Sequence, residues 1–295
     1  MAKPNLVDQL VSRDIVIFGL CRDVAADLEN DVNRLQESFS DFKIHFRFVE
    51  SDSSDSTIDV LRLLSHKYEN MKFVSLGELA RNIPERVERI TFCRNKYLTI
   101  LEEDEELSKC EYVVVSDLDG VNVQLTKEAV MSCWERSDWD ACMANQRAPY
   151  YDIYALRHPE WSPNDCWHYE AELRAEGLNP VKARNLAIYA RQIRIPEDSP
   201  WIKVDSAFGG LAIYRRALFT GIRYSSKLAN GDHVCEHVTL HAQMLEQGAR
   251  LFINPQLINC GWNVHNSSKQ FSKKIKRSIK LILWAIFPNL RKKYF

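Results

Sequence analysis

The chain has 295 residues, of which 45% are hydrophobic and 27% charged, an ordinary composition for a globular protein. Its formal net charge is only −1, but residues 269–295 carry nine basic and no acidic side chains, so residues 1–268 carry a net charge of −10. An acidic body argues against nucleic-acid binding by that part of the chain. With only 10 glycines and no Gly-x-Gly-x-x-Gly or Gly-Lys-Ser/Thr motif, dinucleotide and P-loop sites are also excluded.

Eight cysteines are spread through apolar segments without a Cys-x-x-Cys pair, which predicts buried free thiols. The first residues lack the apolar core of a secretory signal. Both features favour a reducing, cytoplasmic setting.

Short runs of β-forming residues alternate with helical patterns over the first 120 residues. Strands that alternate with helices in this way form parallel sheets with crossover helices. The pattern predicts strands at 14–20, 43–49, 71–75 and 112–116, and helices at 24–39, 58–68 and 85–103.

The second half of the chain is less regular. A strand is expected at 139–145, and the section 146–201 that follows is rich in proline, aromatic and charged residues, as in a lid or binding surface. Residues 204–215 read as a strand interrupted by Gly209 and Gly210, which suggests close approach of a ligand to the backbone. A helix at 235–247 and a strand at 251–259 complete the expected elements.

The strand expected at 112–116 ends in two carboxylates on alternate positions, Asp117 and Asp119, followed by Gly120. Residues two apart in an extended segment point to the same side, so both carboxylates can converge on one hard cation. The carboxyl end of a strand is where open α/β sheets bind ligands, and a divalent cation there can bridge diphosphate oxygens. Asp138 and Asp140 have the same spacing but precede an apolar segment, so they are the weaker candidate.

The order of these pieces, from about residue 14 to 265, resembles a GT-A glycosyltransferase with its Asp-x-Asp motif. The resemblance implies an α/β fold, a single GT-A domain with a Rossmann-like, mostly parallel central sheet over residues 1–268. It also implies that Asp119 ligates Mn²⁺ or Mg²⁺ directly, while Asp117 holds the ribose or a metal-bound water. The implied activity is transfer of a sugar from a UDP- or GDP-sugar to an acceptor hydroxyl.

The resemblance implies further site residues. Glu50 and Asp52 would hold the nucleoside, although this turn also suits a helix cap. Arg94 and Asn95 would lie beside the nucleotide, where an arginine fork can clamp phosphate, although a solvated helix face is the alternative.

On the acceptor side of the fold, Gly209 and Gly210 would let the acceptor approach. Glu236 would be the general base of an inverting enzyme, with Asp232 and Asp205 in reserve, although a carboxylate at a helix start is also a favourable dipole partner.

Histidines are weighed separately because a neutral imidazole can complete a Mn²⁺ shell. The resemblance places His265 where many GT-A enzymes have a C-terminal metal ligand; a surface role is the alternative. His233, His237 and His241 share one helical face but lack a matched second element for zinc, so solvent or acceptor contacts are expected for them.

Residues 269–295 read as a basic amphipathic helix that runs into the apolar stretch 281–287, which is too short to span a bilayer. Aromatic and basic side chains in this order suit an anionic membrane surface, and packing on the body or on a second copy is the alternative. We therefore expect a peripheral enzyme at the cytoplasmic face of a membrane, acting on a glycan or lipid-linked acceptor in the synthesis of surface polysaccharide, lipopolysaccharide or a related glycan. A non-catalytic nucleotide-sugar-binding protein and a nucleotidyltransferase remain as alternatives.

Overall fold

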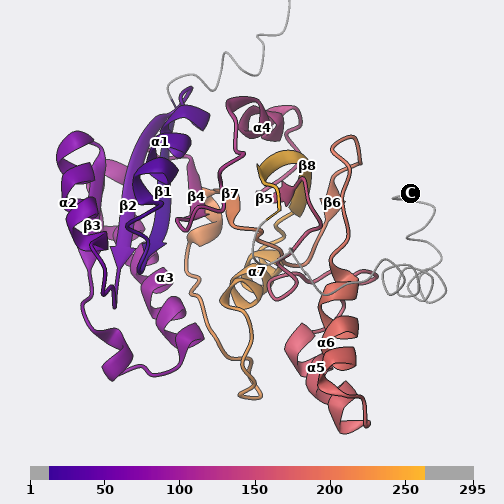
Figure 1. Ribbon diagram of the computed structural model, residues 1–295. Helices are drawn as coiled ribbons and strands as arrows, with labels where there is room; N and C mark the ends of the chain where they lie inside the picture. Colours follow the sequence, from indigo (N-terminus) through magenta and orange to yellow (C-terminus); the bar gives the residue numbers. More distant parts are fainter. Residues whose placement is uncertain (1–12, 263–295) are drawn as a thin grey trace, which may run out of the picture.

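The computed structural model describes residues 13–262, which form one eight-stranded sheet with helices on both faces (Figure 1). The order of the strands across the sheet is β3-β2-β1-β4-β7-β5-β8-β6. The strands are β1 (Asp14–Cys21), β2 (Lys43–Glu50), β3 (Met71–Ser75), β4 (Tyr112–Asp117), β5 (Ala141–Gln146), β6 (Ile202–Lys203), β7 (Leu211–Arg215) and β8 (Leu251–Cys260).

Six of the eight strands run in one direction, and β7 and β6 run against them. The parallel pairing of β1 with β2 and β4 brings Cys21, Glu50 and Asp117 to the same edge of the sheet. The mostly parallel α/β fold expected from the sequence is therefore confirmed.

Apolar side chains alternate along β1 between two buried clusters, one on each face of the sheet. The first cluster takes its helical residues from α3, α5, α6 and α7, and the second from α1, α2 and α4. The helices are α1 (Leu28–Ser38), α2 (Thr57–Lys67), α3 (Arg86–Glu103), α4 (Lys127–Met131), α5 (Cys166–Ala175), α6 (Pro180–Ala187) and α7 (Glu236–Glu246).

Most of the expected elements lie where the sequence pattern places them, within two residues at each end. The helix expected at 24–39 is an exception, because α1 begins only at Leu28. The backbone N–H groups of Val24 and Ala25 donate instead to the side chains of Thr57 and Asp55, at 2.9 and 3.1 Å. The turn before α1 is thus held by the first residue of α2 and by the loop that precedes α2.

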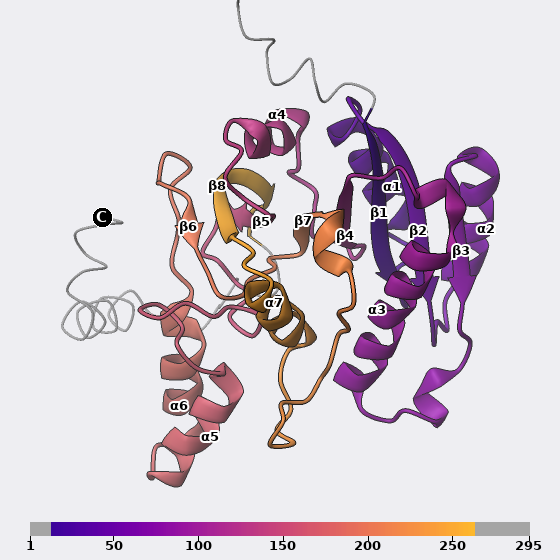
Figure 2. The ribbon, with the colours of Figure 1, turned by 180° about the vertical axis from the view of Figure 1, so that it is seen from behind.

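The strand expected over residues 204–215 is also shorter than expected. Only Leu211–Arg215 forms β7, and Gly209 and Gly210 lie in the turn before it rather than inside a strand. The section 146–201 contains α5 and α6, which pack against each other and stand away from the sheet (Figures 1 and 2).

All eight cysteines are buried and free, as the sequence predicts. Within residues 13–262, no helix combines the length and the hydropathy that crossing a membrane requires. His265 and the tail at 269–295 lie outside the described residues.

Candidate active site

The candidate site begins at the end of β4. Leu118 is buried, whereas the side chains of Asp117 and Asp119 on either side of it are not, so the two carboxylates lie on the opposite side of the backbone from Leu118. Leu118 fills the space beside Gly19 of β1, where an added Cβ would come within 2.3 Å of its Cδ1. The packing of Leu118 against Gly19 therefore directs both aspartates away from the core.

The two aspartates have few partners of their own. The side chain of Asp117 is 38% exposed, and its nearest cation is Arg94, at 3.7 Å. Although part of its side chain is exposed, the protein around Asp117 shields it from water and raises its pKa to about 8; Arg94 opposes the rise, and the nearby carboxylates of Asp119, Asp152 and Glu236 add to it. A bound divalent cation would relieve this repulsion and stabilise the charged form of Asp117.

The carboxylate pair fits a metal that is shared with a substrate. Among residues 13–262, no group of three His, Cys, Asp or Glu side chains is arranged to hold a metal ion. Two carboxylates leave most positions of an octahedral Mg²⁺ or Mn²⁺ to water, phosphate oxygens or other ligands. Asp117 and Asp119 therefore fit an open site rather than a closed structural one.

Asp31 supports the turn that follows Asp119. Its Oδ2 accepts a hydrogen bond from the N–H of Gly120 at 2.9 Å, and the side chain is almost fully buried. Burial, together with the charges of Asp119 and Asp27, raises the pKa of Asp31 to about 7. Sequence reasoning missed this residue, although it lies three positions after Leu28 on the apolar face of the expected helix.

Arg94 of α3 and Glu236 of α7 form the second half of the site. Both residues are only 6% exposed, and Arg94 Nε donates to Glu236 Oε1 at 2.8 Å. Because Arg94 Nη2 also lies 3.7 Å from Asp117 Oδ1, one guanidinium lies between the two carboxylates. Arg94 does not lie on a solvated helix face, so that alternative is wrong.

Asn95 faces a loop backbone rather than the carboxylates. Its Nδ2 donates to the carbonyl of Tyr224 at 3.0 Å, and its Oδ1 accepts from the N–H of Tyr224 at 2.9 Å. Both polar ends of the side chain are thus engaged by the segment that leads to α7.

The two carboxylates of the turn after β2, Glu50 and Asp52, lie in different environments. Glu50 is fully buried and accepts hydrogen bonds from the N–H of Ser53 and the hydroxyl of Ser75. Asp52 has a left-handed backbone, with φ of 59°, and its Oδ1 accepts from the N–H of Ala80 at 2.7 Å. Its Oδ2 is buried without a hydrogen-bond partner in the described chain and lies 3.6 Å from Arg89 Nε. This oxygen can still accept a hydrogen bond, whereas both oxygens of Glu50 already do so.

The helix cap that was the alternative for this turn is not formed by Glu50 or Asp52. The N-cap residue of α2 is Ser56, whose side chain makes no capping bond, and the N–H of Thr57 donates to Asp55 Oδ1 at 2.9 Å. The capping role therefore does not fall on Glu50 or Asp52.

Gly209 and Gly210 are required by packing within the protein. Both have positive φ, 71° and 86°. A Cβ on Gly209 would lie 2.8 Å from the side-chain amide of Gln146, and one on Gly210 would lie 2.8 Å from the hydroxyl of Tyr151. The carbonyl of Gly210 accepts the N–H of Asp117 at 2.9 Å, so this turn also holds the end of β4.

His237 and His241 are buried beneath the site, which contradicts the solvent or acceptor contacts expected for them. His241 contacts Ser206 and Tyr214 through its two ring nitrogens, at 2.9 and 3.0 Å. The ring of His237 stacks on Phe208 at 4.0 Å, and neither nitrogen has a hydrogen-bond partner among residues 13–262. Burial lowers the pKa of His241 to about 3 and that of His237 well below its usual value, so both rings are neutral. His233, by contrast, is exposed.

The second Asp-x-Asp spacing has structural partners. Asp138 pairs with Arg136, and Asp140 Oδ2 accepts from Arg250 Nε at 2.8 Å. Both carboxylates are thus engaged in ion pairs, which agrees with the sequence analysis, where this pair was the weaker candidate for a metal site.

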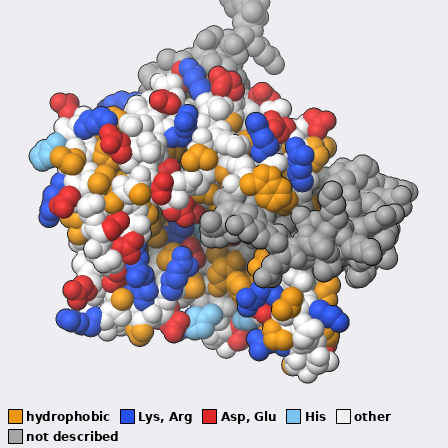
Figure 3. All heavy atoms as spheres, in the orientation of Figure 1, with side chains coloured by type: hydrophobic (Ala, Val, Ile, Leu, Met, Phe, Trp, Pro, Cys, Tyr) orange, Lys and Arg blue, Asp and Glu red, His pale blue; other side chains and the backbone are white. Residues whose placement is uncertain are grey.

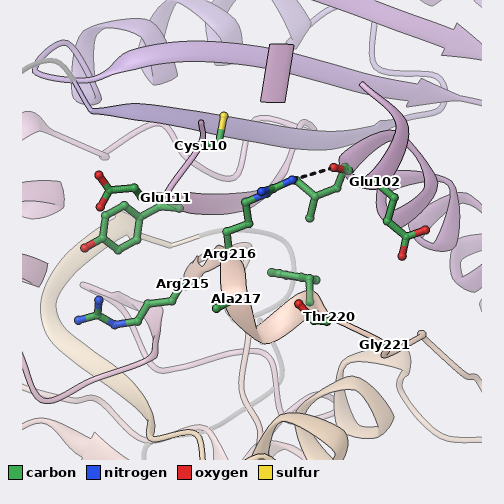
Figure 4. Close-up of a pocket in the computed structure, with 11 residues that line it drawn as sticks. Glu102, Cys110, Glu111, Arg215, Arg216, Ala217, Thr220 and Gly221 are labelled. Atoms are coloured by element: carbon green, nitrogen blue, oxygen red, sulfur yellow. Dashed lines mark hydrogen bonds between the residues drawn. The ribbon is translucent and has the colours of Figure 1, made fainter. Parts of the chain in front are cut away.

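One pocket of about 540 Å³ lies at the other end of β4, next to Tyr112 and the facing Arg215 of β7. Arg216 points from its wall toward α3, where its Nη2 donates to the carbonyl of Leu101 at 3.1 Å (Figure 4). The pocket is thus separate from the carboxylate pair at the end of β4. On the face seen in Figure 3, acidic and basic side chains are interspersed rather than gathered into one basic patch.

No protein-family model matches the chain, and no curated protein matches it in sequence. Solved structures do match it in fold. The mannosyltransferase PcManGT from Pyrobaculum calidifontis, in complex with GDP-Man and Mn²⁺, has a TM-score of 0.50 at 14% identity; the match covers 92% of this chain and 63% of that one. The chain therefore spans less than two thirds of that enzyme.

Two further structures are similar at lower scores. Residues 1–349 of S. aureus TarS match with a TM-score of 0.46 at 12% identity, covering 94% of this chain and 66% of that one. Glucosyl-3-phosphoglycerate synthase from Mycobacterium tuberculosis, in complex with UDP, matches with a TM-score of 0.40 at 13% identity, covering 94% and 80%. The sheet described above and the superposition on PcManGT identify the fold as that of GT-A glycosyltransferases.

Proposed function

We propose that this protein is a metal-dependent glycosyltransferase that moves a sugar from a nucleotide diphosphate sugar to an acceptor hydroxyl. One observation carries the proposal: Asp117 and Asp119 project together from the end of β4, and Glu236 lies across Arg94 from Asp117. Two carboxylates that can bind a cation thus lie close to a third that can accept a proton. Transfer of a sugar from a diphosphate to a hydroxyl uses both functions.

Asp117 and Asp119 would hold Mn²⁺ or Mg²⁺, with His265, outside the described residues, as the proposed third ligand. When bound, such a cation supplies positive charge at the leaving diphosphate. The donor would be a UDP- or GDP-sugar; PcManGT holds GDP-Man with Mn²⁺. Asp52, whose buried Oδ2 has no hydrogen-bond partner in the described chain and lies 3.6 Å from Arg89 Nε, would accept a hydrogen bond from the nucleoside.

Glu236 would take the proton of the acceptor hydroxyl if the reaction inverts the sugar. Its Oε1 is engaged by Arg94, whereas the hydrogen bond to its Oε2 in the described chain is a weak one from the thiol of Cys235, at 3.7 Å. Oε2 is therefore the atom that can receive a proton. Gly209, Gly210 and residues 146–201 would border the acceptor.

The acceptor would be a glycan or a lipid-linked sugar of the cell surface, reached at the cytoplasmic face of a membrane. The composition of residues 269–295 supports this part of the proposal, because basic and aromatic side chains together favour an anionic lipid surface.

Calorimetric titration of the full chain with GDP and with UDP, each with Mn²⁺ and with EDTA, tests the proposal. We expect one diphosphate to bind in the presence of Mn²⁺ and to lose its affinity in EDTA. The corresponding nucleotide sugars should then be consumed when acceptors are added. A folded protein that binds neither diphosphate under any of these conditions would refute the proposed function.

A further inference from the structure

Arg94 and Asn95 join α3 to the polypeptide segment that carries Glu236. Arg94 bonds Glu236 at the first turn of α7, and Asn95 exchanges two hydrogen bonds with the backbone of Tyr224, earlier in the same segment. Two adjacent residues of one helix therefore fix both the side chain of the proposed base and the loop that leads to it.

The guanidinium of Arg94 lies near two aromatic rings, in addition to its hydrogen bond with Glu236. Its central carbon lies 5.1 Å from the ring centroid of Phe208 and 6.0 Å from that of Tyr224. Aromatic faces attract a guanidinium and stack on its plane, which fixes the orientation of its N–H groups. Arg94 is therefore held in one orientation, with its N–H edge toward Glu236 and Asp117.

This arrangement differs from that of an arginine that waits to grip a phosphate. Such a residue presents its fork to the solvent that the phosphate displaces, whereas Arg94 is 6% exposed and already bonded to Glu236. A buried carboxylate that loses its cation is strongly destabilised, so displacing Arg94 from Glu236 toward a ligand would be costly.

We propose that Arg94 is a positioning residue that aligns Glu236 with Asp117, and that it does not clamp the nucleotide. Asn95 holds the Tyr224 loop so that this alignment is kept. The inference rests on the proposed function for the role of Glu236, whereas the coupling between Arg94 and Glu236 can be measured without it.

The chain provides a matched control pair. Arg223 and Glu102 join the same segment to the same helix at 3.0 Å, but both side chains are about half exposed. An exposed pair of this kind contributes little to stability. The variants Arg223→Gln and Glu102→Gln therefore remove an ion pair between the same two elements while leaving the site intact.

The first measurement is a double-mutant cycle on thermal unfolding. Arg94→Met should lower the melting temperature by about 6 to 12 °C, because it leaves Glu236 buried without its cation. Adding Glu236→Gln should restore most of that loss, whereas the exposed control pair should shift the melting temperature by less than about 4 °C and show only weak coupling. Additive losses for Arg94→Met and Glu236→Gln would overturn the inference.

The second measurement separates nucleotide binding from turnover. With Mn²⁺ present, Arg94→Lys and Arg94→Met should bind GDP or UDP within about threefold of the wild type, while donor turnover falls about 100-fold or more. Guanidinium ion added at millimolar concentration should recover part of the turnover of Arg94→Ala. A tenfold loss of nucleotide affinity with normal turnover of bound donor would instead make Arg94 a phosphate clamp. If the wild type binds neither nucleotide, the proposed function is refuted. The double-mutant cycle on thermal unfolding then still tests the coupling between Arg94 and Glu236.

Discussion

At the end of β4, the packing of Leu118 determines the direction of the side chains of Asp117 and Asp119. Because its side chain packs against Gly19, Asp117 and Asp119 are left on the side of the backbone that faces away from the core. Their carboxylates have few partners of their own, in contrast to Asp138 and Asp140, which are paired with arginines. The same spacing of residue types thus gives a candidate ligand pair in one place and surface ion pairs in the other.

Asp119→Asn should weaken Mn²⁺-dependent binding of GDP or UDP by about 100-fold or more, since even residues that only support metal ligands typically contribute 10- to 100-fold. Asp138→Asn is the matched control, because it changes the same residue type in the second Asp-x-Asp motif. The measurement is calorimetry with each nucleotide and Mn²⁺. Equal affinities for Asp119→Asn and the wild type would remove Asp119 from the proposed metal site.

His241 should make the protein sensitive to acid. Its pKa is about 3 in the folded chain because of burial and the charge of Arg94, against 6.5 for an ordinary histidine, so only the unfolded chain takes up this proton as the pH falls below 6.5. The free energy of unfolding should then fall by about 1.4 kcal/mol for each pH unit between 6.5 and 3, from this group alone.

Urea unfolding of the wild type and His241→Gln at several pH values checks this expectation. Glutamine can still bond Ser206 and Tyr214 but does not titrate, so the variant should have the smaller loss of stability on acidification. His237, whose pKa is also lowered, should account for part of the slope that remains. Parallel pH profiles for the two proteins would contradict the prediction.

At the scale of elements, the turn at Gly209 and Gly210 connects β7 to the site. Through its carbonyl, Gly210 holds the N–H of Asp117, and the amide side chains of Gln146 and Asn259 donate to the carbonyl of Gly209 at 3.1 and 2.7 Å. The position of the candidate metal ligand therefore depends on a turn that lies more than 90 residues later in the chain.

Gly210→Ala should lower the free energy of unfolding by about 2 to 4 kcal/mol, because it adds a clash with Tyr151 to the cost of a left-handed alanine. Gly177→Ala is the matched control: its φ is 97°, but no atom lies within 4 Å of the added Cβ, so about 1 to 2 kcal/mol is expected. Denaturant unfolding measures both. A smaller loss for Gly210→Ala than for Gly177→Ala would show that Tyr151 gives way.

Most helices and strands could be located from the sequence because their apolar residues recur at the spacing typical of a helix or a strand. The sequence pattern failed where long-range contacts decide the backbone: Val24 and Ala25 bond the start of α2 and the loop before it instead of starting a helix, and the stretch before Leu211 is a turn fitted to Tyr151 and Gln146. Local propensity contains no information about such partners.

The candidate site was only partly predictable for the same reason. Asp117 and Asp119 are close in the sequence, so the strand period alone puts them together. The contact of Arg94 with Glu236 joins residues 142 positions apart, and only the packing of α3 beside α7 brings them together. The burial of His237 depends likewise on Phe208 and Tyr224, which come from other parts of the chain.

At the scale of the whole molecule, the charge is divided between an acidic body and a basic tail. Deletion of residues 269–295 should release the protein from vesicles of anionic lipid, because each basic residue near such a surface contributes about 1 kcal/mol of attraction. Co-sedimentation with anionic and with zwitterionic vesicles measures this, and the zwitterionic vesicles are the control. Undiminished sedimentation of the shortened chain with anionic vesicles would refute the membrane role.

The antiparallel pairing of β7 with β4 also has a consequence for synthesis on the ribosome. Residues 112–116 remain an open sheet edge until Leu211–Arg215 has left the exit tunnel, and β5 can join the sheet only through β7. Throughout that interval the nascent chain exposes a strand rich in valine, a ready template for pairing with other chains. Fragments that stop near residue 150 should therefore aggregate, and the chain should depend on chaperones most strongly while its middle third is being made.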